Sequence, residues 1–527
     1  MNLITKYAIF AVAAVLSTGC TDKFEEFNKN PYGPTSEDLA GDNVETGILI
    51  QAMTPAIVQG QQNDSQMIDQ MVGLEFGRHA AMINPWNGTN FYTYNPSIDW
   101  YGIPFDKTIP QIYSNFFQIK EKTGAKGIIY AWAQIIRVAA SLKVSDCYGP
   151  IPYSKVNGVD FAVAYDSMED LFNAMFSDLD EAISTLEAAI SSNTDFSTLA
   201  DFDYVYKGNF TKWLKYANSL KLRMAIRIVN ANPTLAQQKA EEAVSNSVGV
   251  MTEAGDAAYC TYNDGMNPFY RAGYTWGNNK GEFRASADIT SYMNGYNDPR
   301  MSAYFEECAA GGYNGVRNGI EQNASSFAGY QNTCSQVKVG QNDPLLIMSA
   351  AEVYFLRAEG KLRGWNMGDG KSAKELYEDG IRTSMSEKGA SIGDYLNCEN
   401  QPANYTDPYK SSNSISAQTT IAPKYDESAG FEKNLERIIV QKWIATYPSG
   451  WETWADFRRT GYPKFFPVVN NLSGSASSGA VTDNGGMRRL PYSQSEYNTN
   501  NANVQNAVQL LGGSDKAATN LWWAKKQ

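Results

Sequence analysis

The chain has 527 residues, 43% of them hydrophobic, which is enough to bury a substantial core in one large domain or in two or three smaller ones. Its formal net charge of −12 argues against nucleic acid or anionic lipid as the main partner, because both would repel it. The single histidine, His79, and the lack of any Cys-x-x-Cys pair argue against most metal sites and imidazole-based catalysis. No cofactor or metal is therefore predicted. A disulfide such as Cys308–Cys334 is left open, and no bridge is predicted.

The first nineteen residues have the features of an export signal. Lys6 precedes a short apolar run, Tyr7–Leu16, which is followed by Ser17-Thr18-Gly19-Cys20. The run is too short to span a bilayer as a finished helix, and small residues before a cut suit a signal peptidase. We predict that residues 1–19 are a lipoprotein signal peptide and that Cys20 is lipidated, although Ser17 stands where a lipobox usually has Leu. The alternative is an ordinary buried helix start.

Residues 20–43 are polar and acidic and contain Pro31, Gly33 and Pro34. This composition predicts a flexible tether that leads from the lipid to the folded body. Residues 44–527 are predicted to form one helical domain with long inserted loops.

The first long helix is predicted over Gly127–Val144, where apolar residues recur with the spacing of a buried helical stripe. A partner helix is predicted to open at Ser167, which forms a capping box with Asp170, and to continue to Ile190. The two segments together predict a helical hairpin.

The same arrangement recurs further along the chain. A helix over Asn209–Val229 precedes Asn232-Pro233, a good start for another helix, and its charged stretch Lys215–Arg227 is predicted to be a solvated face. A third pair is predicted over Asp343–Leu362 and from the capping box of Ser372 and Glu375 to about Lys388. The recurrence without a fixed period predicts a mostly α, tetratricopeptide-like scaffold of helical hairpins.

Long segments rich in Gly, Asn and Tyr separate the predicted hairpins. Loops of this length are usually functional or disordered, and their many aromatics argue against disorder. We predict that they pack as an irregular layer that carries a ligand-binding face. The segments are, approximately, 84–101, 260–285, 311–339, 391–429 and 470–503.

Several segments that cover nearly the whole chain follow a recognisable order. They are Cys20 with its acidic tether and Asn30-Pro31, Asp146–Ser154 (DCYGPIPYS), Trp213–Arg223, Asp298-Pro299-Arg300, Ala351-Glu352, Gln441–Ile444, Trp454–Gly461 and Arg488–Tyr492. In their order and spacing they resemble the SusD/RagB outer-membrane nutrient-binding lipoproteins.

The resemblance implies a cell-surface lipoprotein of the outer membrane that sits as a lid over a SusC-like TonB-dependent transporter. Members of the family capture an oligosaccharide, or in some relatives a peptide, and pass it to the channel; no enzymatic activity is expected. The family fold is mostly α, with four tetratricopeptide-like helix pairs that support a loop-rich ligand face.

A glycan site needs flat aromatic platforms for the sugar faces and polar side chains at the edges. The loops that offer both predict the ligand-binding candidates Trp86, Asn90, Tyr92, Tyr274, Trp276 and, as a weaker candidate, Tyr313. Core or loop packing is an equal alternative for Trp86 and Trp276 and the preferred one for Tyr92 and Tyr313. Trp100, Trp132, Trp213 and Trp443 lie in or beside helical patterns and are assigned to the core.

Other functional classes stay open at this stage. Peptide capture is an alternative within the same family. A lipoprotein glycoside hydrolase would need two carboxylates about 5–9.5 Å apart across a cleft, and the sequence nominates no pair. A helical-repeat module that binds a protein chain is the third alternative.

Overall fold

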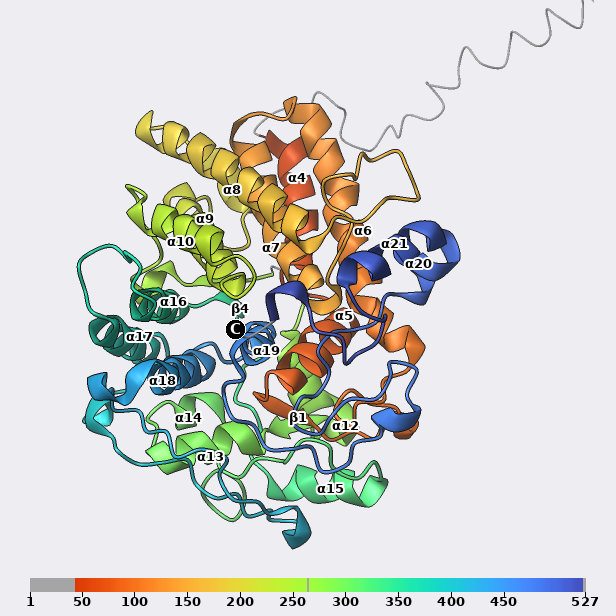
Figure 1. Ribbon diagram of the computed structural model, residues 1–527, viewed down its shortest axis with the longest axis vertical. Coiled ribbons are helices and arrows are strands. Elements are labelled where there is room, and N and C mark those ends of the chain that lie inside the picture. Colours follow the sequence, from red (N-terminus) through yellow and green to blue (C-terminus); the bar gives the residue numbers. More distant parts are fainter. Residues whose placement is uncertain (1–42, 263–264, 525–527) are drawn as a thin grey trace, which may run out of the picture.

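A computed structural model describes residues 43–262 and 265–524 (Figure 1). The predicted signal peptide, the lipidation site Cys20 and the tether up to residue 42 lie outside the described residues. Within them the chain is mostly helical, as predicted, and only short strands interrupt the helices.

The N-terminal half is dominated by long helices that pack side by side in the upper part of Figure 1. They are α4 (Val44–Met53), α6 (Ile98–Thr123), α7 (Gly127–Tyr148), α8 (Met168–Ser191), α9 (Phe210–Arg227) and α10 (Pro233–Ser245). The four-residue α5 (Gln62–Ser65) packs instead against the segment Gln66–Leu74, near the middle of the picture.

The second half mixes short and long helices. They are α11 (Pro268–Tyr270), α12 (Trp276–Asn279), α13 (Ala287–Tyr296), α14 (Met301–Tyr304), α15 (Ala324–Thr333), α16 (Ala350–Leu362), α17 (Ala373–Glu387), α18 (Gly430–Ala445), α19 (Gly450–Thr460), α20 (Gln494–Thr499) and α21 (Asn501–Leu511). The strands form two antiparallel pairs, β1 (Ala80–Met82) with β3 (Phe283–Ala285) and β2 (Ala258–Cys260) with β4 (Leu345–Met348).

The three predicted hairpins are confirmed as the packed pairs α7–α8, α9–α10 and α16–α17. Their start signals act as expected, because the side chains of Ser167, Asn232 and Ser372 each accept a backbone N–H of the first helical turn. The capping box of Ser372 and Glu375 is complete. Local sequence therefore fixed where these helices begin.

The predicted helix start at Asp343-Pro344 is wrong. Leu345–Met348 form strand β4, and α16 begins only at Ala350. The run of four apolar residues is buried on both sides and pairs with β2, an environment that a local pattern cannot distinguish from a helix. The carboxylate of Glu387, from the end of α17, accepts the N–H groups of Ala350 and Ala351 at 2.8 and 3.2 Å and so opens the helix instead of Asp343.

The interpretation of Lys215–Arg227 as a solvated face is also wrong. The Arg227 side chain is only 1% exposed, and it contacts Glu452 of α19 at 2.6 Å and Asp146 of α7 at 3.3 Å. Arg223 binds both carboxylate oxygens of Glu352 in α16 at 2.7 Å. The helical spacing identified a charged face correctly, but other helices cover it.

These contacts belong to a larger buried charge network, which joins four helix elements around α9. Lys442 of α18 lies 2.8 Å from both Glu452 and Asp456 of α19. Arg459 extends the network to Asp456 at 2.9 Å and forms two hydrogen bonds with Glu359 of α16 at 2.6 and 2.8 Å. Each buried charge faces an opposite one, which offsets the cost of removing it from water.

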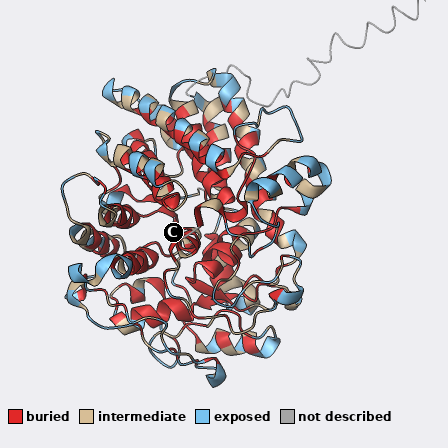
Figure 2. Cartoon of the chain, in the orientation of Figure 1, coloured by how far each residue is buried: buried red, intermediate tan, exposed pale blue. Residues whose placement is uncertain are grey.

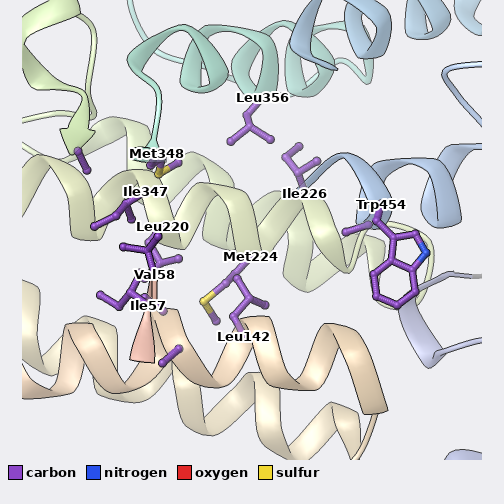
Figure 3. Close-up of a cluster of buried hydrophobic side chains, with 14 of the residues drawn as sticks. Ile57, Val58, Leu142, Leu220, Met224, Ile226, Ile347, Met348, Leu356 and Trp454 are labelled. Atoms are coloured by element: carbon purple, nitrogen blue, oxygen red, sulfur yellow. The ribbon is translucent and has the colours of Figure 1, made fainter. Parts of the chain in front are cut away.

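The hydrophobic core runs between the helices, and buried residues occupy the inner faces in Figure 2. Figure 3 shows α9 at its centre, with Leu220 and Met224 between Leu142 of α7 on one side and Leu356 of α16 on the other. All four side chains are buried. Among the described helices only α7 is long and apolar enough to pass for a membrane span, and 78% of its most apolar window is buried in the protein, as in a core helix.

The described cysteines, at positions 147, 260, 308, 334 and 398, are free thiols, so the pairing of Cys308 with Cys334 does not occur.

Candidate ligand-binding face

A short strand pair positions the two tryptophan-bearing loops. β1 and β3 are antiparallel with Met82 opposite Phe283, so the chain that leaves β1 and the chain that enters β3 lie at the same end of the ladder. Trp86 follows β1 by four residues and Trp276 precedes β3 by seven. Figure 1 shows α12, which begins at Trp276, beside β1.

Trp86 lies in a turn whose backbone is strained. Its own φ is 33°, and the next two residues, Asn87 and Gly88, have φ values of 58° and 87°. A bulky residue with positive φ is rare and costs energy, so the surrounding contacts must hold it. The Gly88 N–H donates to the Pro85 carbonyl at 2.8 Å, and the Asn84 side chain accepts the Trp86 N–H at 3.2 Å.

Trp276 is followed by a second left-handed turn. Gly277, Asn278 and Asn279 all have φ near 60°. Gln331 of α15 donates from its side-chain amide to the carbonyls of Gly277 and Gly281 at 2.9 and 2.7 Å, which clamps the turn from outside. Glycine and asparagine tolerate this conformation best, so the local sequence suits it.

One carboxylate connects the two loops. Glu282 accepts hydrogen bonds from Asn84, in the Trp86 loop, at 2.7 Å and from Gln66 of the π-helical segment Gln66–Leu74. Burial raises the pKa of Glu282, while its two amide partners act in the opposite direction. The backbone of Glu282 also bonds to Ala272 and Ile83, so the same residue fixes both loops.

Of the predicted ligand residues, Trp86 and Trp276 are partly exposed on these turns. Tyr274 is also partly exposed; its ring stacks on Tyr270 with centroids 4.9 Å apart, and its hydroxyl donates to the Val337 carbonyl at 2.7 Å. Tyr313 is partly exposed as well, but no contact ties it to either tryptophan turn.

The remaining predicted ligand residues, Asn90 and Tyr92, are buried and support the turn at Trp86. Asn90 is fully buried and donates to the Pro85 carbonyl at 2.9 Å. Tyr92 is 1% exposed, and its hydroxyl donates to the Asn84 carbonyl at 3.2 Å. Their side chains therefore hold the Trp86 loop in shape and do not reach the surface.

Two further residues belong to this face. Trp100 was assigned to the core with Trp132, Trp213 and Trp443; those three are 1% exposed, whereas Trp100 is partly exposed and meets Trp86 edge-on at 6.1 Å. Arg271 lies between Tyr270 and Tyr274, and its guanidinium forms no hydrogen bond or ion pair with any described residue. The aromatic-rich sequence around Arg271 indicates that this residue belongs to a binding face. Trp100 was missed because it lies at the start of a helical pattern, which favoured its assignment to the core.

We use the name aromatic face for the partly exposed side chains on and beside these two loops, Trp86, Trp100, Tyr270, Arg271, Tyr274 and Trp276. It combines flat apolar rings with a cation that has no partner among the described residues, a composition suited to stacking on sugar rings and to hydrogen bonding with their hydroxyls. Across the described residues no group of three or more His, Cys, Asp or Glu side chains is placed to hold a metal ion.

Comparison with known proteins agrees with this architecture. Residues 26–524 match the model of the SusD-like family, described as SusD and RagB outer membrane lipoproteins. The chain belongs to this family. Sequence and structure thus confirm the resemblance drawn from the motifs.

Solved structures of SusD-like proteins match over almost their full length. One from Bacteroides thetaiotaomicron is 40% identical, with a TM-score of 0.85, and the match covers 92% of this chain and 99% of that one. A SusD homologue from Bacteroides uniformis is also 40% identical, with a TM-score of 0.85 and coverage of 91% and 99%. A chitin-binding SusD homologue from Flavobacterium johnsoniae is 35% identical, with a TM-score of 0.86 and coverage of 92% and 99%. No curated protein matches the chain.

Proposed function

We propose that this SusD-like protein is a lipid-anchored, cell-surface receptor that binds an oligosaccharide on the aromatic face and delivers it unchanged to a SusC-like TonB-dependent transporter. The observation that carries the proposal is the pair of tryptophans held on left-handed turns at one end of the β1–β3 ladder. Strained backbone is retained where it serves function, and here both strained turns carry partly exposed indoles. The likeness to a chitin-binding relative supports a glycan as the ligand class.

Each component of the face has a defined part in this proposal. The indole rings of Trp86 and Trp276 provide platforms for the apolar faces of sugar rings. The Arg271 guanidinium, which has no partner among the described residues, provides a donor for hydroxyl or carboxylate oxygens. Glu282 already accepts two amide hydrogen bonds, so its part is to position the loops and not to contact sugar.

Affinity electrophoresis through gels that contain a panel of soluble polysaccharides tests the proposal. We expect at least one glycan to retard the protein without release of sugar. Trp86→Ala and Trp276→Ala should each weaken the retardation about tenfold or more, which corresponds to about 1.4 kcal/mol, with nearly unchanged melting temperature. Trp454→Ala is the matched control: it removes a buried indole, 2% exposed, and should lower stability by about 3–5 kcal/mol.

Three results would replace the proposal. Release of reducing sugar would make the protein a hydrolase. Retention of peptides with no retention of any glycan would assign it to peptide capture. Recovery of a protein partner other than a transporter, again with no glycan bound, would make it an interaction module.

Anchoring through Cys20 is tested separately. Cys20→Ala should abolish metabolic labelling with palmitate and move the protein from the outer membrane to the soluble fraction. Labelling that persists in the variant would place the lipid elsewhere.

Delivery to a transporter requires a contact surface, and the loop between α7 and α8 offers one. Phe161 is fully exposed and Val159 is 78% exposed, the two most exposed large apolar side chains in the described chain. Phe161→Ser should reduce co-purification with the SusC-like transporter, while Leu510→Ser, at a residue 47% exposed on α21, should not. Equal recovery with both variants would remove this loop from the interface.

A further inference from the structure

A cavity of about 190 Å³ lies next to β4, apart from the tryptophan turns. It is larger than the roughly 150 Å³ cavity that accommodates a benzene molecule in an engineered protein core. Most of its wall is apolar or aromatic and comes from segments distant in sequence. Its aromatic residues are Phe269, Phe283, Tyr304 and Tyr447, and Leu345 and Leu346 of β4 complete the apolar wall.

The lining also contains the polar or charged side chains of Tyr259, Asn267, Lys338, Asp343 and Lys388. Lys388, which directly follows α17, lines the cavity and is only partly exposed. Its Nζ lies 5.5 Å from the centre of the Tyr304 ring and donates one long hydrogen bond of 3.5 Å to the Tyr447 carbonyl. No described carboxylate forms a salt bridge with it. Burial lowers the pKa of Lys388, as expected for an ammonium that has lost much of its water.

Tyr259 of β2 also lines the wall. Its hydroxyl forms no hydrogen bond with any described residue, whereas the hydroxyls of Tyr304 and Tyr447 each donate to a backbone carbonyl. Burial raises the pKa of Tyr259, so the phenol stays protonated and is available as a donor near neutral pH.

The remaining charged groups near the cavity are already engaged. Glu387 accepts the N–H groups that open α16, and the Asp343 carboxylate accepts the Gly340 N–H at 2.7 Å. Lys338 at the rim donates to the Ser302 carbonyl at 3.1 Å. Lys388, whose only described acceptor is the distant Tyr447 carbonyl, and Tyr259, whose hydroxyl has no described partner, are therefore the lining donors that remain for a ligand.

We propose that this cavity binds a small carboxylate carried on an apolar ring, with the carboxylate at Lys388 and Tyr259 and the ring against the aromatic wall. A partly desolvated ammonium gains most from an anion. The other polar side chains of the lining, Asn267, Lys338 and Asp343, already have hydrogen-bond partners, so the rest of the cavity suits an apolar ring better than a sugar. This ligand class differs from the glycan assigned to the aromatic face, although Tyr274 of that face contacts the cavity wall at Val337.

Calorimetric titration of the mature protein with benzoate tests the proposal. Benzyl alcohol, which keeps the ring without the charge, and acetate, which keeps the charge without the ring, are the comparison probes. We expect benzoate to bind at least tenfold more tightly than either. Equal affinities for benzoate and acetate, or no benzoate binding at millimolar concentration, would overturn the proposal.

Substitutions of the two proposed donors test whether each of them contacts the carboxylate. Lys388→Met should weaken benzoate binding at least tenfold, and Tyr259→Phe, which preserves the ring and the fold, should weaken it severalfold. Lys338→Met is the matched control at the rim and should leave the affinity unchanged. Unchanged affinity in both Lys388→Met and Tyr259→Phe would also overturn the proposal, and circular dichroism melts establish that each variant is folded.

Discussion

The charge network around α9 and the aromatic face use polar groups in opposite ways. In the network, Glu452 contacts Arg223, Arg227 and Lys442, and each of those cations has a second carboxylate partner. On the aromatic face, Arg271 has no partner among the described residues and the rings are partly open to solvent. Polar groups that are paired within the protein hold the scaffold together, whereas Arg271 keeps a guanidinium without a described partner, which we propose for contact with the ligand.

The largest expected effect comes from breaking the network at its centre. Glu452→Gln removes the carboxylate that faces three cations, two of them almost fully buried, and should lower the free energy of unfolding by about 3–5 kcal/mol. Chemical denaturation measures the change. Glu399→Gln, in an exposed pair with Lys424, is the matched control and should leave the free energy of unfolding nearly unchanged, because solvent screens the pair. Similar small effects for both variants would show that the network does not hold the scaffold.

The next prediction concerns pH. Burial alone would raise the pKa of Glu359, but Arg459 and Arg363 outweigh it and lower the pKa to about 2 from an ordinary value of 4.5. The stabilisation of the folded state by the ionised Glu359 carboxylate is therefore complete above about pH 4.5 and is lost as the pH falls toward 2. At pH 7 it is on the order of 3 kcal/mol. Glu359→Gln should thus differ from the wild type strongly at pH 7 and much less at pH 3 in urea unfolding.

Glu75, which supports β1 through the Met82 N–H, provides a control of opposite sign. Burial raises the pKa of Glu75 to about 7, with Arg78 acting against it. The folded protein then holds a proton that the unfolded chain releases, so this group's contribution is present below pH 4.5 and is lost as the pH rises to 7. The free energy of unfolding of Glu75→Gln should therefore increase relative to that of the wild type as the pH rises. Parallel pH trends for the two variants would contradict the assignment.

The same contrast explains what sequence could predict. Capping signals at Ser167, Asn232 and Ser372 are local, so the hairpins they open were predictable. Burial of Arg227 depends on α7 and α19, which are distant in sequence, and no periodicity in α9 reveals which helices cover it.

The aromatic face was predictable only in part for the same reason. The composition of two loops indicated Trp86 and Trp276, but the turn at Trp86 folds Asn90 and Tyr92 beneath it through backbone contacts that a residue pattern does not encode. The cavity at Lys388 could not be predicted from the sequence, because its walls come from β2, β3, β4, α14 and the segment after α18, which are distant from one another along the chain.

The smallest expected effect tests whether the strained turn itself matters to binding. Asn278 is exposed and has φ 60° and ψ 38°, so Asn278→Ala should cost about 1 kcal/mol through backbone strain alone, while Asn278→Gly should cost little. Because the turn positions the Trp276 ring, alanine should also weaken glycan retention and glycine should largely preserve it. Asn342→Ala, at an exposed residue without positive φ, is the control. Glycan retention that is equal in all three variants would mean that Trp276 binds without help from the conformation of its turn.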